Sequence, residues 1–267
     1  MSVDACADLV ARGDPDRFAA AMCAQGQARA DLLVLFAFNL EVARAPWVTQ
    51  EAMIAEMRLQ WWADAVEEIF AGGFVRRHEV VTPLADVVMR GSLLREPFDA
   101  LITARRRDIY PDPPEDTAAF DTYLRDTSGT LSAMAGAILG VRDTSIADVG
   151  TALGLGNLLR AVPELAARGR KPLPLPGLSQ RALLDGAFDD VAARIVRGLA
   201  QEALDRLAKV RQAGVSKTAV PALLTGWRGR LALQVAARDP AGLFTLRPEP
   251  KLRERAYLAR AHLLGRW

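Results

Sequence analysis

Residues 36–70, FAFNLEVARAPWVTQEAMIAEMRLQWWADAVEEIF, and residues 150–174, GTALGLGNLLRAVPELAARGRKPLP, decide the fold. In the first stretch, apolar side chains recur at every fourth position after a break at Pro46, which predicts one long amphipathic helix. The apolar row consists of Met53, Met57, Trp61, Ala65 and Ile69. Thr49 is the expected N-cap, and Gly72-Gly73 the expected stop. This interpretation places Trp61 in the core, whereas Trp62, rotated by about 100°, reaches a neighbouring helix or a cavity wall.

Helical periodicity fills the rest of the chain, whereas the patterns typical of strands are nearly absent. Helices are predicted at residues 15–24, 27–44, 49–71, 79–91, 96–109, 116–139, 144–162, 188–212, 218–237 and 251–265. Proline and glycine clusters separate them, such as PDPP at 111–114 and PLPLPG at 172–177. No linker is long or polar enough to divide the chain. The sequence therefore predicts one all-α domain over residues 1–267.

Composition excludes several classes of protein. The 267 residues are 51% hydrophobic and 25% charged, which argues against a disordered, collagen-like or disulfide-rich chain. The formal charge of +2 provides no overall field for a polyanion, so nucleic acid is not an expected partner. Only four of the 34 basic residues are lysines, a bias typical of GC-rich bacterial coding sequences.

The sequence predicts a soluble or peripheral protein in the cytoplasm. Cys6 and Cys23 lie among alanines and predict small buried side chains in a reducing compartment. Asp4 and Asp8 interrupt the apolar run that a signal peptide needs. The longest strongly apolar stretch, residues 32–38, is far shorter than the roughly 20 residues that span a bilayer.

Few residues carry a recognisable catalytic pattern. The sequence has no HExxH, CxxC, nucleophile elbow or glycine-rich phosphate loop. Of its two histidines, His78 is expected to cap or pack at a helix start, and His262 to lie at a surface helix end. From spacing alone, both quoted stretches are core helices with solvated ends.

The order of three motifs carries a resemblance to a known family. LFAFNLEVAR at 35–44, MRLQWWADAVEEIF at 57–70 and GLGNLLRAVPELAARGRKPLP at 154–174 are separated by helical stretches, as in the squalene/phytoene synthase family, which the chain resembles. The resemblance runs from residues 16–18 to at least Pro174 and is weaker beyond. It implies the isoprenoid synthase fold, a single helical bundle around a central apolar cavity.

The same resemblance argues against the family's reaction, the joining of two prenyl diphosphates. That chemistry uses Mg²⁺ held by aspartates on two facing helices, because a hard cation takes oxygen ligands and bridges to phosphate. The motif positions correspond here to Ala43, Arg44 and Trp47 in the first cluster and to Ala161, Glu164 and Leu165 in the second. Only Glu164 retains a carboxylate. The resemblance thus implies no catalytic residue, no metal and no cofactor. It also implies that the six motif positions lie on two facing helices around one cavity.

Other residues of the family motifs are retained, which indicates a repurposed fold. They are Arg58, Trp61, Asp108, Tyr123, Gly129, Asn157 and Arg160. Within the family the chain most resembles the complex I assembly factor six branch, which also replaces the acidic motifs. That likeness implies a non-catalytic protein that assists assembly of respiratory complex I (NADH:quinone oxidoreductase), with a complex I subunit or assembly intermediate as partner.

Two other functions stay open. In an active Mg²⁺-dependent prenyltransferase, Glu164 would join a relocated metal site with Glu41, Asp64, Glu67 and Glu68, although the last three also fit a solvated helix face. In a binding protein, the cavity would hold an isoprenoid, quinone or prenyl diphosphate, with basic side chains on an anionic head group. The candidate ligand-binding residues are Arg44, Arg58, Trp62, Asn157, Arg160, Arg168, Arg170 and Lys171. The alternative for residues 168–171 is an exposed basic turn.

Overall fold

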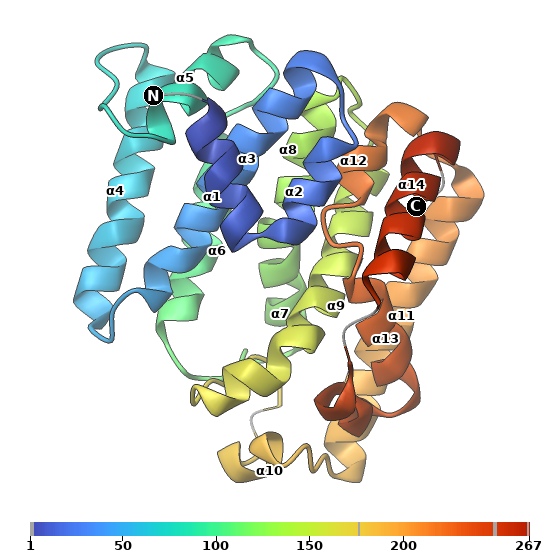
Figure 1. The fold of residues 1–267 in the computed structure, drawn as a ribbon. Coiled ribbons are helices and arrows are strands. Elements are labelled where there is room, and N and C mark those ends of the chain that lie inside the picture. The colour runs from blue at the N-terminus through green and yellow to red at the C-terminus, as the bar shows by residue number, and fades with distance from the viewer. Residues whose placement is uncertain (1–2, 176, 248–249, 266) are drawn as a thin grey trace.

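The computed structural model describes residues 3–175, 177–247, 250–265 and 267, and every regular element in these ranges is helical (Figure 1). The elements are α1 (Val3–Gly13), α2 (Pro15–Met22), α3 (Gly26–Arg44), η1 (Ala45–Trp47), α4 (Ala52–Ala71), α5 (Val81–Met89), α6 (Glu96–Arg105), η2 (Arg106–Ile109), α7 (Thr117–Leu124), the π-helical η3 (Arg125–Gly129), α8 (Thr130–Ile138), α9 (Thr144–Ala167), α10 (Gln180–Leu184), α11 (Asp190–Ala213), η4 (Lys217–Ala219), α12 (Val220–Leu223), α13 (Gly229–Arg238), η5 (Pro240–Thr245) and α14 (Lys251–Leu264). The prediction of an all-α protein is confirmed.

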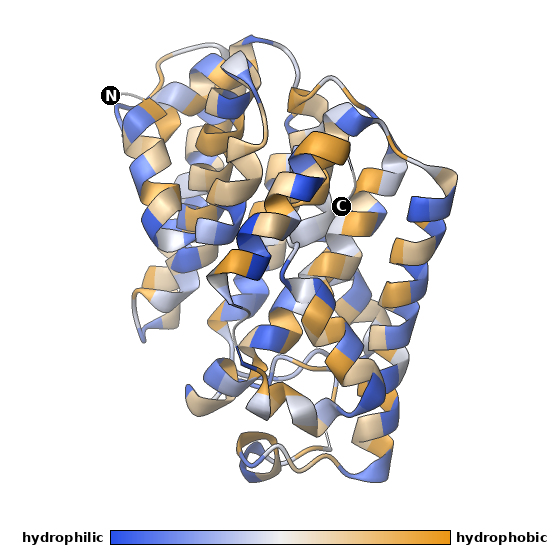
Figure 2. Ribbon diagram, turned by 45° about the vertical axis from the view of Figure 1, so that its right-hand side comes forward, coloured by the Kyte–Doolittle hydropathy of each residue, from blue (hydrophilic) through white to orange (hydrophobic). Residues whose placement is uncertain are grey.

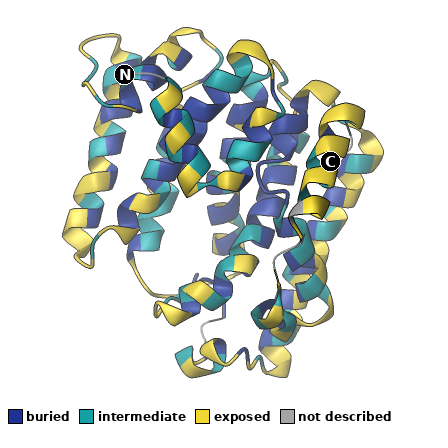
Figure 3. Cartoon of the chain, in the orientation of Figure 1, coloured by how far each residue is buried: buried dark blue, intermediate teal, exposed yellow. Residues whose placement is uncertain are grey.

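The middle of the bundle is formed by α3 and α9, around which the other helices pack (Figures 1 and 3). Every residue of α3 from Asp31 to Leu40 is buried, which explains why this helix has no polar side. On the outer helices hydrophobic and hydrophilic residues alternate, as expected for helices with one solvated face (Figure 2). None of the described helices combines the length and apolarity needed to cross a membrane.

Glycines let α9 pack so closely against its neighbours that no side chain fits between them. A Cβ atom on Gly156 would lie 2.2 Å from the carbonyl oxygen of Gly229 at the start of α13. A Cβ atom on Gly154 would lie 2.4 Å from Cβ of Ser128 in η3. Both distances are far below van der Waals contact, so the glycine-dotted sequence of α9 is required by close helix packing.

The apolar face of α4 differs from the prediction. Met53 and Met57 are 75% and 65% exposed, Trp61 is half-buried, and Trp62 is buried against Phe38 of α3 at 5.5 Å between ring centroids. The buried residues are Ala55, Leu59, Trp62, Ala65, Val66 and Ile69. A strict four-residue repeat rotates by about 40° per step and so leaves the core, whereas alternating steps of three and four stay on it. The assignment of Trp61 to the core is therefore wrong, while Trp62 does reach a neighbouring helix.

Several boundaries also differ from the prediction. α4 begins at Ala52, and Thr49 accepts a hydrogen bond from the Glu51 amide at 3.1 Å without capping the helix. α9 continues through Pro163 to Ala167, because tertiary packing outweighs the one helical hydrogen bond that proline cannot donate. The predicted helix 116–139 contains a π-helical turn, and 218–237 divides into α12 and α13. α1 and α10 were not predicted.

Candidate functional site

A cavity of about 320 Å³ lies where α3 ends, between η1, η2, the α7–η3 segment and α9. Its titratable lining residues are Arg17, Arg105, Arg107, Asp108, Tyr110, Asp112, Tyr123, Arg170 and Lys171. We call this cavity the basic pocket, because five cationic side chains line it against two carboxylates. Ala43, Trp47, Leu158 and Leu165 supply part of its apolar wall.

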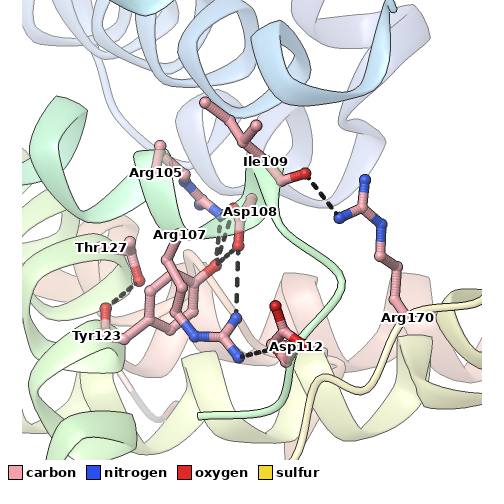
Figure 4. Close-up of polar contacts among 8 residues, drawn as sticks. All are labelled: Arg105, Arg107, Asp108, Ile109, Asp112, Tyr123, Thr127 and Arg170. Carbon is pink, nitrogen blue, oxygen red and sulfur yellow. Dashed lines mark hydrogen bonds and ion pairs between the residues drawn. The ribbon is translucent and has the colours of Figure 1, made fainter. Parts of the chain in front are cut away.

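A hydrogen-bonded cluster around Asp108 forms one side of the basic pocket (Figure 4). Arg105, at the end of α6, donates to Oδ2 of Asp108 at 3.0 Å and to the hydroxyl of Tyr123 at 2.9 Å. The Tyr123 hydroxyl in turn donates to Oδ1 of Asp108 at 2.9 Å. Arg107 lies 4.0 Å from Asp108 and 5.4 Å above the Tyr123 ring. The carboxylate of Asp108 is therefore fully engaged with protein partners.

Burial and charge set the protonation states within this cluster. Burial raises the pKa of Tyr123 above its ordinary value; the positive charge of Arg105 opposes the rise, and the negative charge of Asp108 adds to it. The pKa of Arg105 is also raised, because Tyr123 and Asp108 favour its charged form more than burial disfavours it. Tyr123 thus remains a neutral hydrogen-bond donor beside the charged guanidinium group of Arg105.

The backbone places Tyr123 at the start of an irregular turn. Tyr123 lies in the last turn of α7, directly before the π-helical η3, whose Thr127 hydroxyl donates to the Tyr123 carbonyl at 2.7 Å. Such π-helical turns add a residue to a helix and occur frequently at functional sites. Thr127, Ser128 and Gly154 also line the basic pocket, so the close contact between η3 and α9 forms part of its wall.

The turn after α9 is tied to the segment after η2. Arg170 donates to the carbonyl of Ile109 at 3.0 Å, and the amide of Lys171 donates to the carbonyl of Pro111 at 3.3 Å. The Arg170 guanidinium also lies 4.9 Å above the ring of Trp47. These contacts join the turn after α9 to η1, η2 and the segment after η2, so this part of the turn is held in place.

The structure brings some of the predicted site residues together and separates others. The predicted residues that line the basic pocket are Ala43, Trp47, Asn157, Leu165, Arg170 and Lys171. The predicted residues outside its lining are Arg44, Arg58, Trp62, Arg160, Ala161, Glu164 and Arg168. Of the six motif positions, Ala43, Trp47 and Leu165 thus line one cavity, and Arg44, Ala161 and Glu164 lie outside its lining. Arg44 and Glu164 are each one residue, or about 100°, away from a lining residue on the helix.

The separated arginines have acidic neighbours elsewhere. Arg44 lies 3.6 Å from Glu41, and Arg168 pairs with Glu164 at 2.6 Å, both on exposed surface. Arg160 pairs with the buried Asp16 of α2 at 3.1 Å. The predicted arginine set therefore does not assemble around one head group. Arg58 and Trp62 line a separate hollow with His78, whose Nδ1 accepts a hydrogen bond from the Val80 amide at 3.1 Å.

The residues at the motif positions do not fit Mg²⁺. Ala43, Trp47, Ala161 and Leu165 offer no side-chain oxygen, and Mg²⁺ requires oxygen ligands. Within the described ranges, no three His, Cys, Asp or Glu side chains gather in a way that could hold a metal ion. The relocated site does not assemble either, since Glu68 is bound by Arg76 at 2.8 Å and Asp64 by Gln60 at 2.8 Å.

Three cations of the basic pocket were not predicted from the sequence. Arg17 comes from α2, Arg105 from α6 and Arg107 from η2, so no spacing within one helix links them. The run of four charged residues at Arg105–Asp108, two residues before the PDPP turn, was a local signal, because such a run is unusual inside an amphipathic helix.

Comparison of the sequence with known proteins finds two kinds of relative. The family model "Squalene/phytoene synthase" matches residues 10–255. The "NADH dehydrogenase (ubiquinone) complex I, assembly factor 6" of Bos taurus is 25% identical over 207 residues, which are 74% of this chain and 62% of the relative. The "15-cis-phytoene synthase" of Synechocystis sp. is 31% identical over 163 residues, which are 53% of this chain and 48% of that enzyme. The chain thus spans less than two thirds of the length of these relatives.

A solved structure shares the fold over nearly the whole chain. A dehydrosqualene synthase in complex with a ligand superimposes with a TM-score of 0.78 and 15% identity, covering 99% of this chain and 97% of that one. The prediction of the isoprenoid synthase fold is confirmed.

Proposed function

Because the chain belongs to the squalene/phytoene synthase family, whose model matches residues 10–255, we propose that it is a non-catalytic member that assists the assembly of respiratory complex I. Its partner is a subunit or assembly intermediate of that complex. It works in the cytoplasm or peripherally at the inner face of the cytoplasmic membrane of a bacterium.

The observation that carries the proposal is the charge of the basic pocket. Five of the six motif positions have no side-chain oxygen, and Arg105, Arg107, Arg170 and Lys171 line the basic pocket. A cation that approached this cavity would be repelled by the guanidinium groups, since arginine does not deprotonate in proteins. One surviving carboxylate, Glu164, is exposed and paired with Arg168. The carboxylate ligands that would hold Mg²⁺ for the family's reaction are therefore missing from this cavity.

The relatives named as complex I assembly factors support the second half of the proposal. The match covers 74% of this chain at 25% identity. The phytoene synthase relative matches a shorter part, 53% of the chain, at 31% identity. We infer the assembly role from the broader match together with the missing ligands.

Deleting the gene tests the proposal in the cell. Membranes of the deletion strain should lose NADH:quinone oxidoreductase activity, while succinate oxidation, which bypasses complex I, and carotenoid and hopanoid content stay unchanged. The wild-type gene should restore activity, and a variant with Arg170→Glu and Lys171→Glu should restore less if these residues contact the partner. Normal oxidoreductase activity with loss of squalene or phytoene would overturn the proposal and indicate a prenyltransferase.

A second candidate is a binding protein for an isoprenoid, quinone or prenyl diphosphate with its anionic head group in the basic pocket. It is favoured by the excess of cations there, since guanidinium groups bind phosphate and carboxylate in two-pronged hydrogen bonds. Incubation with farnesyl diphosphate and Mg²⁺ distinguishes a binding protein from an enzyme. Tight binding without release of diphosphate supports the binding protein. Turnover at enzyme rates, on the order of 1 per second, supports a Mg²⁺-dependent enzyme instead.

A further inference from the structure

A second, larger cavity lies on the other side of α9, beneath α14. It has a volume of about 560 Å³ and is lined by residues of α9, the 224–228 turn, α13, the segment after η5, and α14. An adjoining cavity of about 390 Å³ shares Arg230 and Tyr257 with it. Together the two cavities form what we call the arginine groove, whose guanidinium groups belong to Arg160, Arg211, Arg228, Arg230, Arg247 and Arg260.

The positive charge of the arginine groove is only partly neutralised. Asp16 lies 3.1 Å from Arg160 and 3.0 Å from Arg228, and Glu254 lies 2.8 Å from Arg228. No carboxylate among the described residues pairs with the other four arginines of the groove: Arg211, Arg230, Arg247 and Arg260. Like charges gathered in this way repel one another, and bound anionic groups would relieve that repulsion.

Two buried donors in the groove have no acceptor within the part of the chain that the structure describes. They are the indole Nε1 of Trp227, a residue only 7% exposed, and the Nε of Arg211. A buried donor without an acceptor is costly and requires explanation. The pKa of Arg211 is lowered first by burial and then by the charges of Arg230 and Arg260. The guanidinium group of Arg211 is therefore both short of an acceptor and repelled by neighbouring cations. Both observations indicate a binding partner that brings oxygen acceptors and negative charge.

The groove also has an apolar wall. The rings of Trp227 and Tyr257 stack with a centroid distance of 5.5 Å and an angle of 16°. Leu231 and Leu246 line the same cavity. A small inorganic anion would leave this surface unused, whereas a ligand with both an anionic group and an apolar body would cover it.

We propose that the arginine groove binds a phosphate-bearing amphiphile, with its phosphate oxygens on Arg230 and Arg247 and its apolar body against Trp227 and Tyr257. Guanidinium groups match phosphate geometry, and the cavity is large enough for a phosphate and part of an attached chain or ring. This site is distinct from the basic pocket and does not depend on the proposed function.

Such a phosphate has two sources, a phospholipid in a membrane or a soluble phosphate ester. Three leucines of α14 are exposed: Leu252 is 80% exposed, Leu263 77% and Leu264 52%. Leu252 and Leu263 are eleven residues apart, which places them within about 20° of each other on the helix. The helix that covers the groove therefore presents apolar side chains to its surroundings, which favours the lipid source.

Binding of the full chain to two probes tests the proposal. The probes are phenyl phosphate in solution and vesicles of phosphatidylcholine with and without phosphatidylglycerol. The test variant is Arg230→Gln with Arg247→Gln, which removes two charges without breaking an ion pair within the described residues. The control is Arg194→Gln with Arg197→Gln, which removes the same charge from exposed positions on α11 outside both cavities. Arg247→Gln alone serves if the double variant fails to fold, since Arg247 is exposed.

The wild-type chain and the control should bind at least one probe, and the test variant should bind it about tenfold or more weakly, as expected for the loss of charge-assisted hydrogen bonds. If the test variant loses binding only to the phosphatidylglycerol vesicles, the natural ligand is a phospholipid. If it loses binding to phenyl phosphate, the natural ligand is a soluble phosphate ester. Absence of binding to both probes, unchanged binding by the test variant, or equal loss in the control would overturn the proposal. None of these readouts involves complex I, so the result is separable from that of the gene deletion.

Discussion

Replacing Tyr123 by phenylalanine removes one hydroxyl from the most densely bonded part of the basic pocket. That hydroxyl accepts from Arg105 at 2.9 Å and donates to Asp108 at 2.9 Å. Asp108 retains Arg105 at 3.0 Å, so the carboxylate is not left alone. With hydrogen bonds to charged groups contributing about 1.5–3 kcal/mol each and part of the network surviving, we expect the variant to lose about 2–3 kcal/mol of unfolding free energy. For a chain of this size that corresponds to a melting temperature about 5 °C lower.

Urea denaturation followed by circular dichroism measures this loss, and Tyr110→Phe provides the matched control. Tyr110 lines the same pocket, but it is 52% exposed. Its hydroxyl has no hydrogen-bond partner among the residues described, so the control should stay within about 0.5 kcal/mol of wild type. If Tyr123→Phe were as stable as Tyr110→Phe, the assignment of Asp108, Arg105 and Tyr123 as a cooperative cluster would be refuted.

The stability difference between wild type and Tyr123→Phe should depend on pH in one direction. Burial raises the pKa of Tyr123, so on titration with base the unfolded chain ionises before the folded one. The stability that depends on the neutral phenol is therefore complete below about pH 10, the ordinary tyrosine pKa, and declines as the pH rises above it. The difference in unfolding free energy between wild type and Tyr123→Phe should shrink in that range. A difference that grew with pH would contradict the protonation state inferred for Tyr123.

The other predictions concern packing and thiol chemistry. Gly156→Ala should cost about 3 kcal/mol or more in chemical denaturation, because its Cβ atom would lie 2.2 Å from a backbone oxygen, whereas Gly198→Ala, with no atom within 4 Å, should stabilise by about 0.5–1 kcal/mol. Burial raises the pKa of the Cys6 thiol to about 11, so a thiolate-specific reagent at pH 8 should label the half-buried Cys23 first and Cys6 only on unfolding; early labelling of Cys6 would contradict its burial. Trp62→Ala should cost about 3–5 kcal/mol, and a loss below about 1 kcal/mol would place Trp62 outside the core.

Helix content was predictable because the apolar pattern of each helix is local. Residues 32–40 are apolar except for Asn39, and the structure buries them all. The end of α9 was not predictable in the same way, since Pro163 normally ends a helix and only tertiary packing carries the chain through it. The error on Trp61 came from fitting a strict four-residue repeat to a helix of 3.6 residues per turn.

The basic pocket was only partly predictable, because its residues meet through the fold. Arg170 and Lys171 were identified beside a recognisable motif, whereas Arg17 and Arg105 reach the pocket from helices that are far apart in the sequence. Whether an arginine lines a cavity or pairs on the surface depends on its neighbours in space. Arg160 and Arg168 illustrate this, since each was predicted for the same head group and each is bound to a different carboxylate.

The contact between Gly156 and Gly229 makes α9 a shared partition between two chambers. Asn157 belongs to the basic pocket and Arg160, one turn away, to the arginine groove. Backbone contact with α13 prevents α9 from sliding at one side without displacing the other. If occupation of one chamber shifts α9, thermodynamic reciprocity requires that occupation of the other alter the first by the same factor. Binding in the basic pocket and binding in the arginine groove would then be coupled through the contact between Gly156 and Gly229.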